Sequence, residues 1–249
     1  MDPIGQLIIT EQQCDDSMAW ARQMVPLASD GTVLITRELT KARGRQGRRW
    51  VLASGQITHT LILKPALPAP NEQALATLTM ALTLGLWAPF QHRGVTLKWP
   101  NDLYLNNKKL GGMLLENLWQ DGKLAAVIAG YSININNSCC SHDVLSSIAT
   151  SLNDETGQPY DLGALQLQLF GSLSQFYRQW QQGEYQEIFQ LWRRHQGYLG
   201  KPIKVHNRDG SLLEGIAQDV LPNGDLILHL PVADRTYIIT FAQVEEVII

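Results

Sequence analysis

An arginine-rich stretch in the first part of the chain carries residue types suited to binding an anion. It reads Arg-Gly-Arg-Gln-Gly-Arg-Arg-Trp over positions 43–50. The planar, permanently charged fork of arginine suits phosphate and carboxylate oxygens, and glycine lets the backbone approach a ligand closely. Because so many like charges repel one another when no anion is bound, we interpret the stretch as a loop that becomes ordered when it closes on a polyanion. A solvated basic turn and a nucleic-acid-binding patch are the alternatives.

A second stretch places two lysines around a turn and a carboxylate. It reads Lys-Trp-Pro-Asn-Asp over 98–102, and Lys109 follows, with glycines at 111 and 112. Proline presets a turn, and Asn and Asp side chains bond nearby backbone, so we predict a tight corner between two short strands. Further along, Asn134 and Asn136 end an extended run, and their spacing places both side chains on one face.

The composition is that of a soluble globular protein, with 45% hydrophobic and 17% charged residues. A net charge of -3 argues against general affinity for DNA, which depends on neutralising phosphates, and favours a small anionic ligand. Three cysteines without regular spacing predict a reduced, cytoplasmic setting, and six scattered histidines predict no protein-bound metal. We expect neither a signal peptide nor a membrane-spanning segment.

Hydrophobic periodicity predicts an α+β domain followed by a small β-rich domain. We expect strands at 6–10, 32–36 and 59–64, hairpins between 95 and 135, a surface loop at 137–147, and helices at 18–25, 71–90, 161–182 and 185–195. A core-facing stripe in the helix at 71–90 comprises Leu75, Leu78, Leu82, Leu86 and Phe90. Beyond 197–201 the pattern becomes all-β, as is typical of a small barrel, with strands at 202–205, 212–220, 226–230 and 237–241. We therefore place the domains at 1–197 and 198–249.

The two central stretches, taken together, resemble the biotin–protein ligase family. The resemblance is carried by the lysine-containing stretch at 98–112, the arginine-rich stretch upstream and the segment 130–134 downstream. It implies an α+β, class II synthetase-like mixed sheet with helices, plus a small C-terminal SH3-like β-barrel. Some members carry an amino-terminal helix-turn-helix that represses biotin synthesis genes. Because this chain begins directly with the core, we expect the monofunctional type, with no DNA partner.

The family's chemistry implies that a carboxylate attacks the α-phosphorus of ATP, giving biotinyl-5'-AMP and pyrophosphate. A lysine amine of a carrier protein then attacks this mixed anhydride. Arginines, lysines and Mg²⁺ offset the repulsion between the two anionic reactants. A charge-assisted hydrogen bond contributes about 1.5–3 kcal/mol. A handful of them therefore accounts for much of a typical enzymatic lowering of the activation free energy, which is roughly 8 kcal/mol or more. The implied partner is the biotin carboxyl carrier protein of acetyl-CoA carboxylase.

The resemblance also implies residue roles. The catalytic set is Arg45, Lys109, Asp102 and Lys98. The biotin-binding set is Asp15, Asp16, Ser17, Leu39, Arg43, Gly44, Arg45, Lys109 and Gly112. The ATP-binding set is Arg48, Trp50, Lys98, Asn101 and Asn134. Trp50 would stack on adenine, Lys109 would contact the biotin end of the adenylate, and Asp102 would orient the incoming lysine and accept its proton.

The chain departs from the family pattern where the acid is recognised. Asp15-Asp16-Ser17 stands in place of Ser-Thr-Asn, and Leu39 and Ala42 stand in place of a glutamine and a glycine. These departures leave open a ligase for another acid, such as lipoate or octanoate. A non-enzymatic adenylate-binding module is a third hypothesis. We also expect that an exposed sheet edge could pair two cores as a homodimer.

Overall fold

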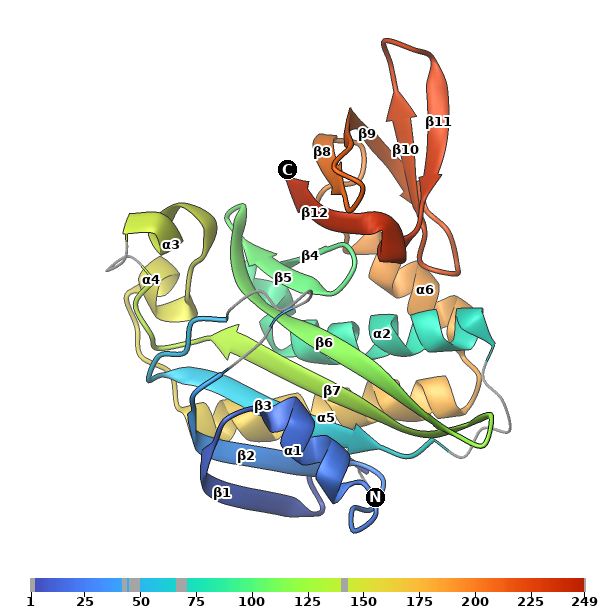
Figure 1. The fold of residues 1–249 in the computed structure, drawn as a ribbon. Helices are drawn as coiled ribbons and strands as arrows, with labels where there is room; N and C mark the ends of the chain where they lie inside the picture. The colour runs from blue at the N-terminus through green and yellow to red at the C-terminus, as the bar shows by residue number, and fades with distance from the viewer. Residues whose placement is uncertain (1–2, 42–43, 45–49, 66–70, 140–142, 249) are drawn as a thin grey trace.

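Two β-sheets and a set of helices make up the fold of this computed structural model, which describes residues 3–41, 44, 50–65, 71–139 and 143–248. The larger sheet has seven strands in the order β1-β2-β3-β7-β6-β5-β4, and the smaller has five in the order β11-β10-β9-β8-β12. Figure 1 shows the smaller sheet standing beyond one end of the larger one. The α+β fold class predicted from the sequence is confirmed.

The larger sheet is mixed: β1 and β2 pair in parallel, and the other neighbouring strands pair antiparallel. Its strands are β1 (Ile8–Cys14), β2 (Thr32–Leu39), β3 (Gln56–Leu63), β4 (Thr96–Lys98), β5 (Asp102–Leu105), β6 (Lys108–Gln120) and β7 (Lys123–Asn134). The central strands β3 and β7 are almost continuously apolar on the face that packs against helices, because that face is fully buried.

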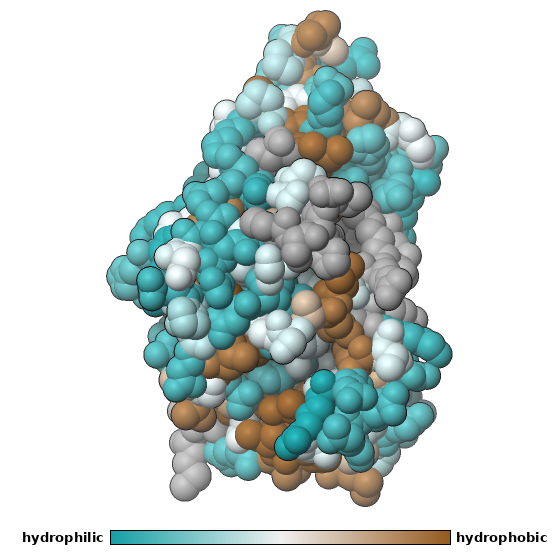
Figure 2. All heavy atoms as spheres, turned by 90° about the vertical axis from the view of Figure 1, so that its left-hand side faces the viewer, coloured by the Kyte–Doolittle hydropathy of each residue, from teal (hydrophilic) through white to brown (hydrophobic). Residues whose placement is uncertain are grey.

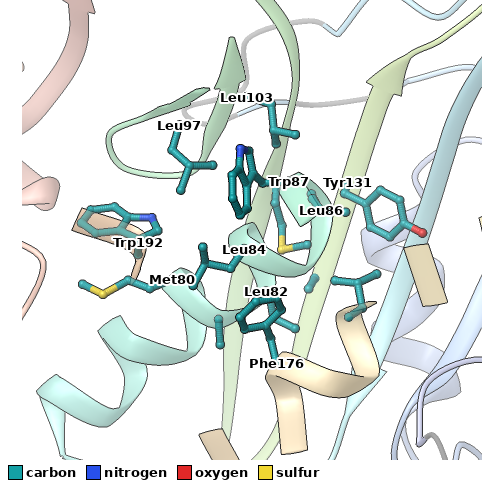
Figure 3. Packing of buried hydrophobic residues seen from close by; sticks show 14 of the residues in the cluster. Met80, Leu82, Leu84, Leu86, Trp87, Leu97, Leu103, Tyr131, Phe176 and Trp192 are labelled. Atoms are coloured by element: carbon teal, nitrogen blue, oxygen red, sulfur yellow. The ribbon is translucent and has the colours of Figure 1, made fainter. Parts of the chain in front are cut away.

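Helices cover one face of this sheet almost completely. They are α2 (Glu72–Trp87), the 3₁₀ turn η2 (Ala88–Arg93), α5 (Leu162–Gln181) and α6 (Tyr185–Arg194). The predicted stripe is confirmed: Leu78, Leu82, Leu86 and Phe90 are fully buried, and Leu75 packs against the same core. Figure 3 shows Leu82, Leu84 and Leu86 of α2 near Phe176 of α5 and Tyr131 of β7.

The long helical segment Glu72–Arg93 is apolar enough to cross a membrane by length and composition alone. However, 67% of its most apolar window is buried inside the protein, which is the pattern of a core helix. The α-helix gives way to 3₁₀ geometry at Ala88, next to Pro89, which lacks a backbone N–H, and Gly94 ends the turn at φ 74°. The outer surface seen in Figure 2 is mostly hydrophilic, with apolar side chains gathered in a few places.

The opposite face of the sheet is covered only in part. Helix α1 (Ser17–Met24) packs over one end, and the short helices α3 (Asp143–Ile148) and α4 (Leu152–Thr156) lie at the other (Figure 1). The prediction of a surface loop at 137–147 is wrong in two respects. Part of it forms α3, and Asn137 and Cys139 are buried because their segment is bonded to neighbouring elements.

The smaller sheet is antiparallel throughout. It consists of β8 (Pro202–Asn207), β9 (Leu212–Val220), β10 (Leu226–Leu230), β11 (Arg235–Ile239) and β12 (Val244–Ile248), with a 3₁₀ turn, η3 (Phe241–Gln243), before the last strand. Trp99 fastens it to the larger sheet: its Nε1 donates to the Gly224 carbonyl at 2.7 Å, and its ring meets Phe241 edge-on. Arg193 adds a two-pronged ion pair with Asp219, at 2.5 and 2.7 Å.

Candidate active site

A cavity of about 720 Å³ lies over the open face of the larger sheet. Its walls come from α1, β3, the β4–β5 corner, β6, β7, the 137–139 segment and α3, and β12 of the smaller sheet closes one side. The lining includes most of the residues predicted from the sequence, namely Asp16, Ser17, Leu39, Gly44, Trp50, Lys98, Asn101, Asp102, Lys109, Gly112 and Asn134. Residues more than 200 positions apart in the chain thus share one enclosure.

The arginines of the predicted loop, Arg43, Arg45 and Arg48, lie outside the described residues. The two described members of that stretch, Gly44 and Trp50, both line the cavity.

A lysine–carboxylate pair lies in the cavity wall. Lys109 Nζ donates to Asp102 Oδ2 at 2.7 Å, and the same ammonium lies 5.4 Å from the centre of the Trp50 ring. A Cβ added to Gly112 would lie 2.3 Å from Asp102 Oδ1, so the glycine provides the space that this carboxylate occupies. The two central motifs therefore meet here, as the sequence predicted for Lys109, Asp102 and Trp50.

The second lysine of the motif lies against an aromatic ring. Lys98 Nζ donates to the Tyr104 hydroxyl at 2.8 Å. Burial and the nearby carboxylates of Asp102 and Glu246 raise the pKa of the Tyr104 phenol above its usual value, so it stays protonated. Lys98 and Asp102 are Cα partners across the β4–β5 hairpin, which fixes the spacing between the two functional groups.

The corner between these lysines is held by Asn101. This buried side chain donates from Nδ2 to the Met113 carbonyl, and its own backbone carbonyl accepts from Met113 N at 3.1 Å. Asn101 lines the cavity, as predicted, while its amide N–H₂ fastens the corner to β6.

A row of polar side chains crosses the cavity floor on β3 and β7 and ends at Ser17 of α1. We call it the polar row; its members are Ser17, Gln56, Thr58, Thr60, Ser132 and Asn134, all of which line the cavity. Gln56 pairs with Asn134 and Thr58 with Ser132 in the antiparallel register. Gln56 Nε2 donates to Asn134 Oδ1 at 2.8 Å, and the Thr58 and Ser132 hydroxyls lie 2.6 Å apart. Because side chains alternate along a strand, these residues face the cavity together.

The end of the polar row nearest α1 is formed by Thr60 and Ser17, whose hydroxyls lie 2.9 Å apart. Thr60 pairs with Gly130, where a Cβ would lie 2.7 Å from the sulfur of Met18, so α1 approaches the sheet closely at this point. The β3 members of the row, Gln56, Thr58 and Thr60, were not among the predicted site residues. The signal was present, because Gln, Thr and Thr alternate with apolar or buried residues from 56 to 60.

Beneath the row, on the helix-covered face, His59 Nδ1 and the Tyr131 hydroxyl are 2.8 Å apart. Burial lowers the pKa of His59 to about 4, so the imidazole is neutral at physiological pH. The pair joins β3 to β7 directly below the cavity floor.

The two aspartates before α1 have different surroundings. Asp16 caps the helix, with Oδ1 accepting from Met18 N at 3.0 Å and Ala19 N at 3.1 Å, and it lines the cavity. Asp15 is not among the described residues that line it. Its carboxylate accepts from Thr40 Oγ1 at 2.5 Å and Lys41 Nζ at 3.0 Å, and both contacts lower the pKa of Asp15. The structure places Asp15 beside a separate hollow and not in the cavity wall where the sequence predicted it.

Within the described ranges, no group of three or more His, Cys, Asp or Glu side chains is arranged to hold a metal ion.

The chain is similar in sequence to known biotin ligases. Residues 10–134 match the model of the biotin/lipoate A/B protein ligase family. A biotin–[acetyl-CoA-carboxylase] ligase of Paracoccus denitrificans is 29% identical over 222 residues, which cover 87% of this chain and 92% of the relative. The bifunctional ligase/repressor BirA of Bacillus spizizenii is 28% identical over 230 residues, 91% of this chain and 70% of the relative.

Among solved structures, the fold is similar to that of the biotin protein ligase from Aquifex aeolicus in complex with biotin and ATP. The TM-score is 0.80 with 23% sequence identity, and the match covers 97% of this chain and 98% of that one. At this identity the likeness concerns the fold, and it includes both sheets.

Proposed function

The chain belongs to the biotin/lipoate A/B protein ligase family, and we propose that it is a biotin–protein ligase that acts in two steps. A biotin carboxylate oxygen attacks the α-phosphorus of ATP, and the bond to the pyrophosphate leaving group breaks, giving biotinyl-5'-AMP. The ε-amine of a carrier lysine then attacks the carbonyl carbon of this anhydride. The bond to the phosphate oxygen breaks and AMP leaves, so that biotin ends in an amide bond.

The observation that carries the proposal is the pairing of Lys109 with Asp102 in one cavity with the polar row. In the first step, we assign Lys109 to the carboxylate end of biotin, where its positive charge offsets the charge of the nucleophile and of the α-phosphate. We assign Lys98 and, by resemblance, Arg43, Arg45 and Arg48 to carboxylate and phosphate oxygens. ATP enters as its Mg²⁺ complex, and the ion adds positive charge on the phosphates.

In the second step, we assign Asp102 to the incoming lysine. A free lysine amine has a pKa of about 10.4 and must lose a proton before it attacks. Asp102 Oδ2 accepts a hydrogen bond from Lys109 Nζ at 2.7 Å. Transfer of Lys109 to the adenylate would release Asp102 to accept a hydrogen bond, and then a proton, from the carrier lysine.

The polar row supports biotin over lipoate or octanoate as the acid. The ring urea of biotin carries two N–H donors and a carbonyl acceptor, and hydroxyls such as those of Ser17, Thr58 and Thr60 can both donate and accept. A dithiolane or an alkyl tail offers no such groups, so its burial would take these hydroxyls out of water and leave them only the bonds they make to one another.

We further propose that the carrier is the biotin carboxyl carrier protein of acetyl-CoA carboxylase, that the reaction takes place in the cytoplasm, and that DNA is not a partner. Strand β1 forms one edge of the larger sheet and could pair two cores as a homodimer. Sedimentation equilibrium at several concentrations tests the dimer.

The decisive experiment incubates the purified chain with ATP, Mg²⁺, labelled biotin and a carrier domain. We expect label on the carrier lysine from the wild type and none from Lys109→Ala. An acid panel in ATP–pyrophosphate exchange then tests the substrate: exchange with lipoate or octanoate but not with biotin would reassign the acid. No exchange with any acid would favour an adenylate-binding module.

A further inference from the structure

A series of bonded side-chain amides begins at the Asn134 end of the polar row and continues along the cavity wall to Asn137. Asn134 Nδ2 donates to the Thr150 carbonyl at 3.0 Å, and Asn137 Nδ2 donates to Asn134 Oδ1 at 3.2 Å. Because a backbone carbonyl only accepts, Asn134 must turn its N–H₂ toward Thr150 and its oxygen toward Asn137. Asn137 must then present its own N–H₂ to that oxygen.

Gln56 fixes the same orientation from the other side. Its Oε1 accepts from Ala53 N at 3.2 Å, and its Nε2 donates to the Val51 carbonyl at 3.0 Å and to Asn134 Oδ1 at 2.8 Å. Two independent backbone contacts therefore set the Gln56 amide, and both routes make Asn134 Oδ1 an acceptor.

These bonds leave the Asn137 Oδ1 atom without a donor in the described part of the chain. Asn137 is only 5% exposed, and its Oδ1 is buried with no hydrogen-bond partner among the residues that the structure describes. Asn137 is among the residues that line the cavity. A buried amide oxygen without a donor is rare in folded proteins and costs stability, so its retention at a cavity wall points to a donor on the ligand.

The backbone around Asn137 is held in place. Asn136 N donates to the Gly55 carbonyl at 2.8 Å, Asn153 N to the Ile135 carbonyl at 2.8 Å, and Cys139 N to Asp154 Oδ2 at 2.8 Å. Gly55 lies so close that a Cβ there would be 2.7 Å from Asn137 N. The backbone that carries the Asn137 side chain is thus fixed at the cavity wall.

Asn137 lies at the opposite end of the polar row from Ser17, where we place the acid. Along β3 and β7 the row runs from Thr60 beside Ser17, through Thr58 and Ser132, to Asn134, and Asn137 lies past that end. With the acid at the Ser17 end and the phosphates near Lys98, the Asn134 end is left for the nucleotide base.

We propose that Asn137 selects adenine: its Oδ1 accepts a hydrogen bond from the exocyclic amine of the ATP base. Guanine and hypoxanthine carry a carbonyl oxygen at the corresponding ring position, which would face Oδ1 and repel it. This assignment rests on the proposed function, since it takes ATP as the occupant. It adds a specificity-determining side chain to the reaction.

The test removes the amine and the side chain separately and together. ATP and purine riboside triphosphate, which lacks the 6-amino group, are compared in biotin-dependent pyrophosphate exchange by the wild type and Asn137→Ala. For the wild type, loss of the amine should lower kcat/KM by about tenfold or more, the size of one good hydrogen bond. For Asn137→Ala, the two nucleotides should react at nearly equal rates.

Asn136→Ala is the matched control. Asn136 lies on the same segment, but its amide is occupied by the backbone of Tyr160 at 2.8 and 2.9 Å. We expect this variant to keep the wild-type preference for ATP even if its rates fall. If Asn137→Ala keeps that preference too, or if it changes the KM for biotin and not for ATP, the proposal is wrong.

Calorimetric titration with the two nucleotides separates this proposal from the proposed function. A wild type that binds ATP more tightly than the deamino analogue, with the difference lost in Asn137→Ala, supports the adenine contact even if no biotin-dependent exchange occurs. Equal binding of the two nucleotides by the wild type overturns the contact whatever the exchange assay gives.

Discussion

Lys109 and Asp102 are the pair on which the proposed chemistry depends, and they can be separated by step. Lys109→Ala removes a cation from the first transition state, so we expect adenylate formation to fall by roughly 10²-fold or more. Asp102→Asn keeps the shape but accepts no proton. We expect it to leave adenylate formation nearly intact and to lower transfer to the carrier by roughly 10²–10⁴-fold. Single-turnover assays of the two steps measure this, and equal losses in both steps for Asp102→Asn would contradict its role as proton acceptor.

Gly112 offers a second test at the scale of one atom. The methyl group of Gly112→Ala would lie 2.3 Å from Asp102 Oδ1 and 3.4 Å from the nearest backbone atom, the Asn101 carbonyl oxygen. The carboxylate can swing away at little expense in stability, but its bond to Lys109 is then broken. We expect at least a tenfold loss of ligase activity, measured with the carrier assay, and a small change in the free energy of unfolding.

Gly171→Ala serves as the control for that substitution. Gly171 lies inside α5, and a Cβ there meets no atom within 4 Å. We expect unchanged activity and a gain in stability of about 0.5–1 kcal/mol, because alanine is the better helix former. Similar activity losses in both variants would show that the Gly112 effect does not come from Asp102.

At this scale the sequence was informative about side chains set by a short motif. Lys98, Asp102 and Lys109 lie within a dozen positions, and hairpin geometry alone brings them together. Of the polar row, Ser17 and Asn134 were predicted as site residues, but the row as a whole was not. It depends on the register between β3 and β7, whose paired members lie 74 and 78 positions apart. No sequence pattern indicated that Asp15 would bond to Thr40 and Lys41, which follow the end of β2.

At the scale of elements, α4 supports the backbone around Lys109 from outside the cavity. Glu155 accepts hydrogen bonds from the Thr150 hydroxyl and from Asn106 Nδ2. Thr150 N in turn donates to the Lys109 carbonyl at 3.0 Å, and Asn106 lies in the turn that leads into β6. One carboxylate therefore braces the backbone on both sides of Lys109.

We expect Glu155→Ala to lower kcat for adenylate formation by several-fold to tenfold while leaving the KM for biotin and ATP within about twofold. The reason is that Lys109 is held less well, although no substrate contact is lost. Steady-state exchange kinetics measure both constants. A selective rise in the KM for ATP would instead indicate that Glu155 acts on the nucleotide.

Elements with strong periodicity were predicted well, and those without it were not. The helix at 161–182 agrees with α5 (Leu162–Gln181) because its apolar residues recur at helical spacing. Helix α3 and the burial of Asn137 and Cys139 were missed. Their order comes from distant partners, such as Asp154 for Cys139 N, which no local pattern reveals.

At the scale of the whole molecule, His59 links stability to pH. Its pKa is about 4 in the folded protein and about 6.5 in the unfolded chain, so the unfolded state binds more protons between these values. Stability therefore rises with pH through this window and is lost as pH falls from 6.5 toward 4. The loss at pH 5 relative to pH 7 is about 2 kcal/mol.

Denaturant unfolding at pH 7 and pH 5 measures this loss. His59→Gln keeps a polar partner for the Tyr131 hydroxyl but does not titrate, so we expect its stability to change less over the same interval by about 2 kcal/mol. An identical pH dependence in the two proteins would mean that other groups cause the loss.

The way in which Trp99 joins the two sheets has an evolutionary consequence. The corner that presents Lys98 and Asp102 to the cavity also grips Gly224 and Phe241 of the small sheet. Substitutions at those two positions, although remote from any reacting atom, would shift the corner and so be exposed to selection on turnover. Among homologous sequences, we expect substitutions at Gly224 and Phe241 to covary with substitutions at Trp99, because a change on one side of this contact disturbs the other.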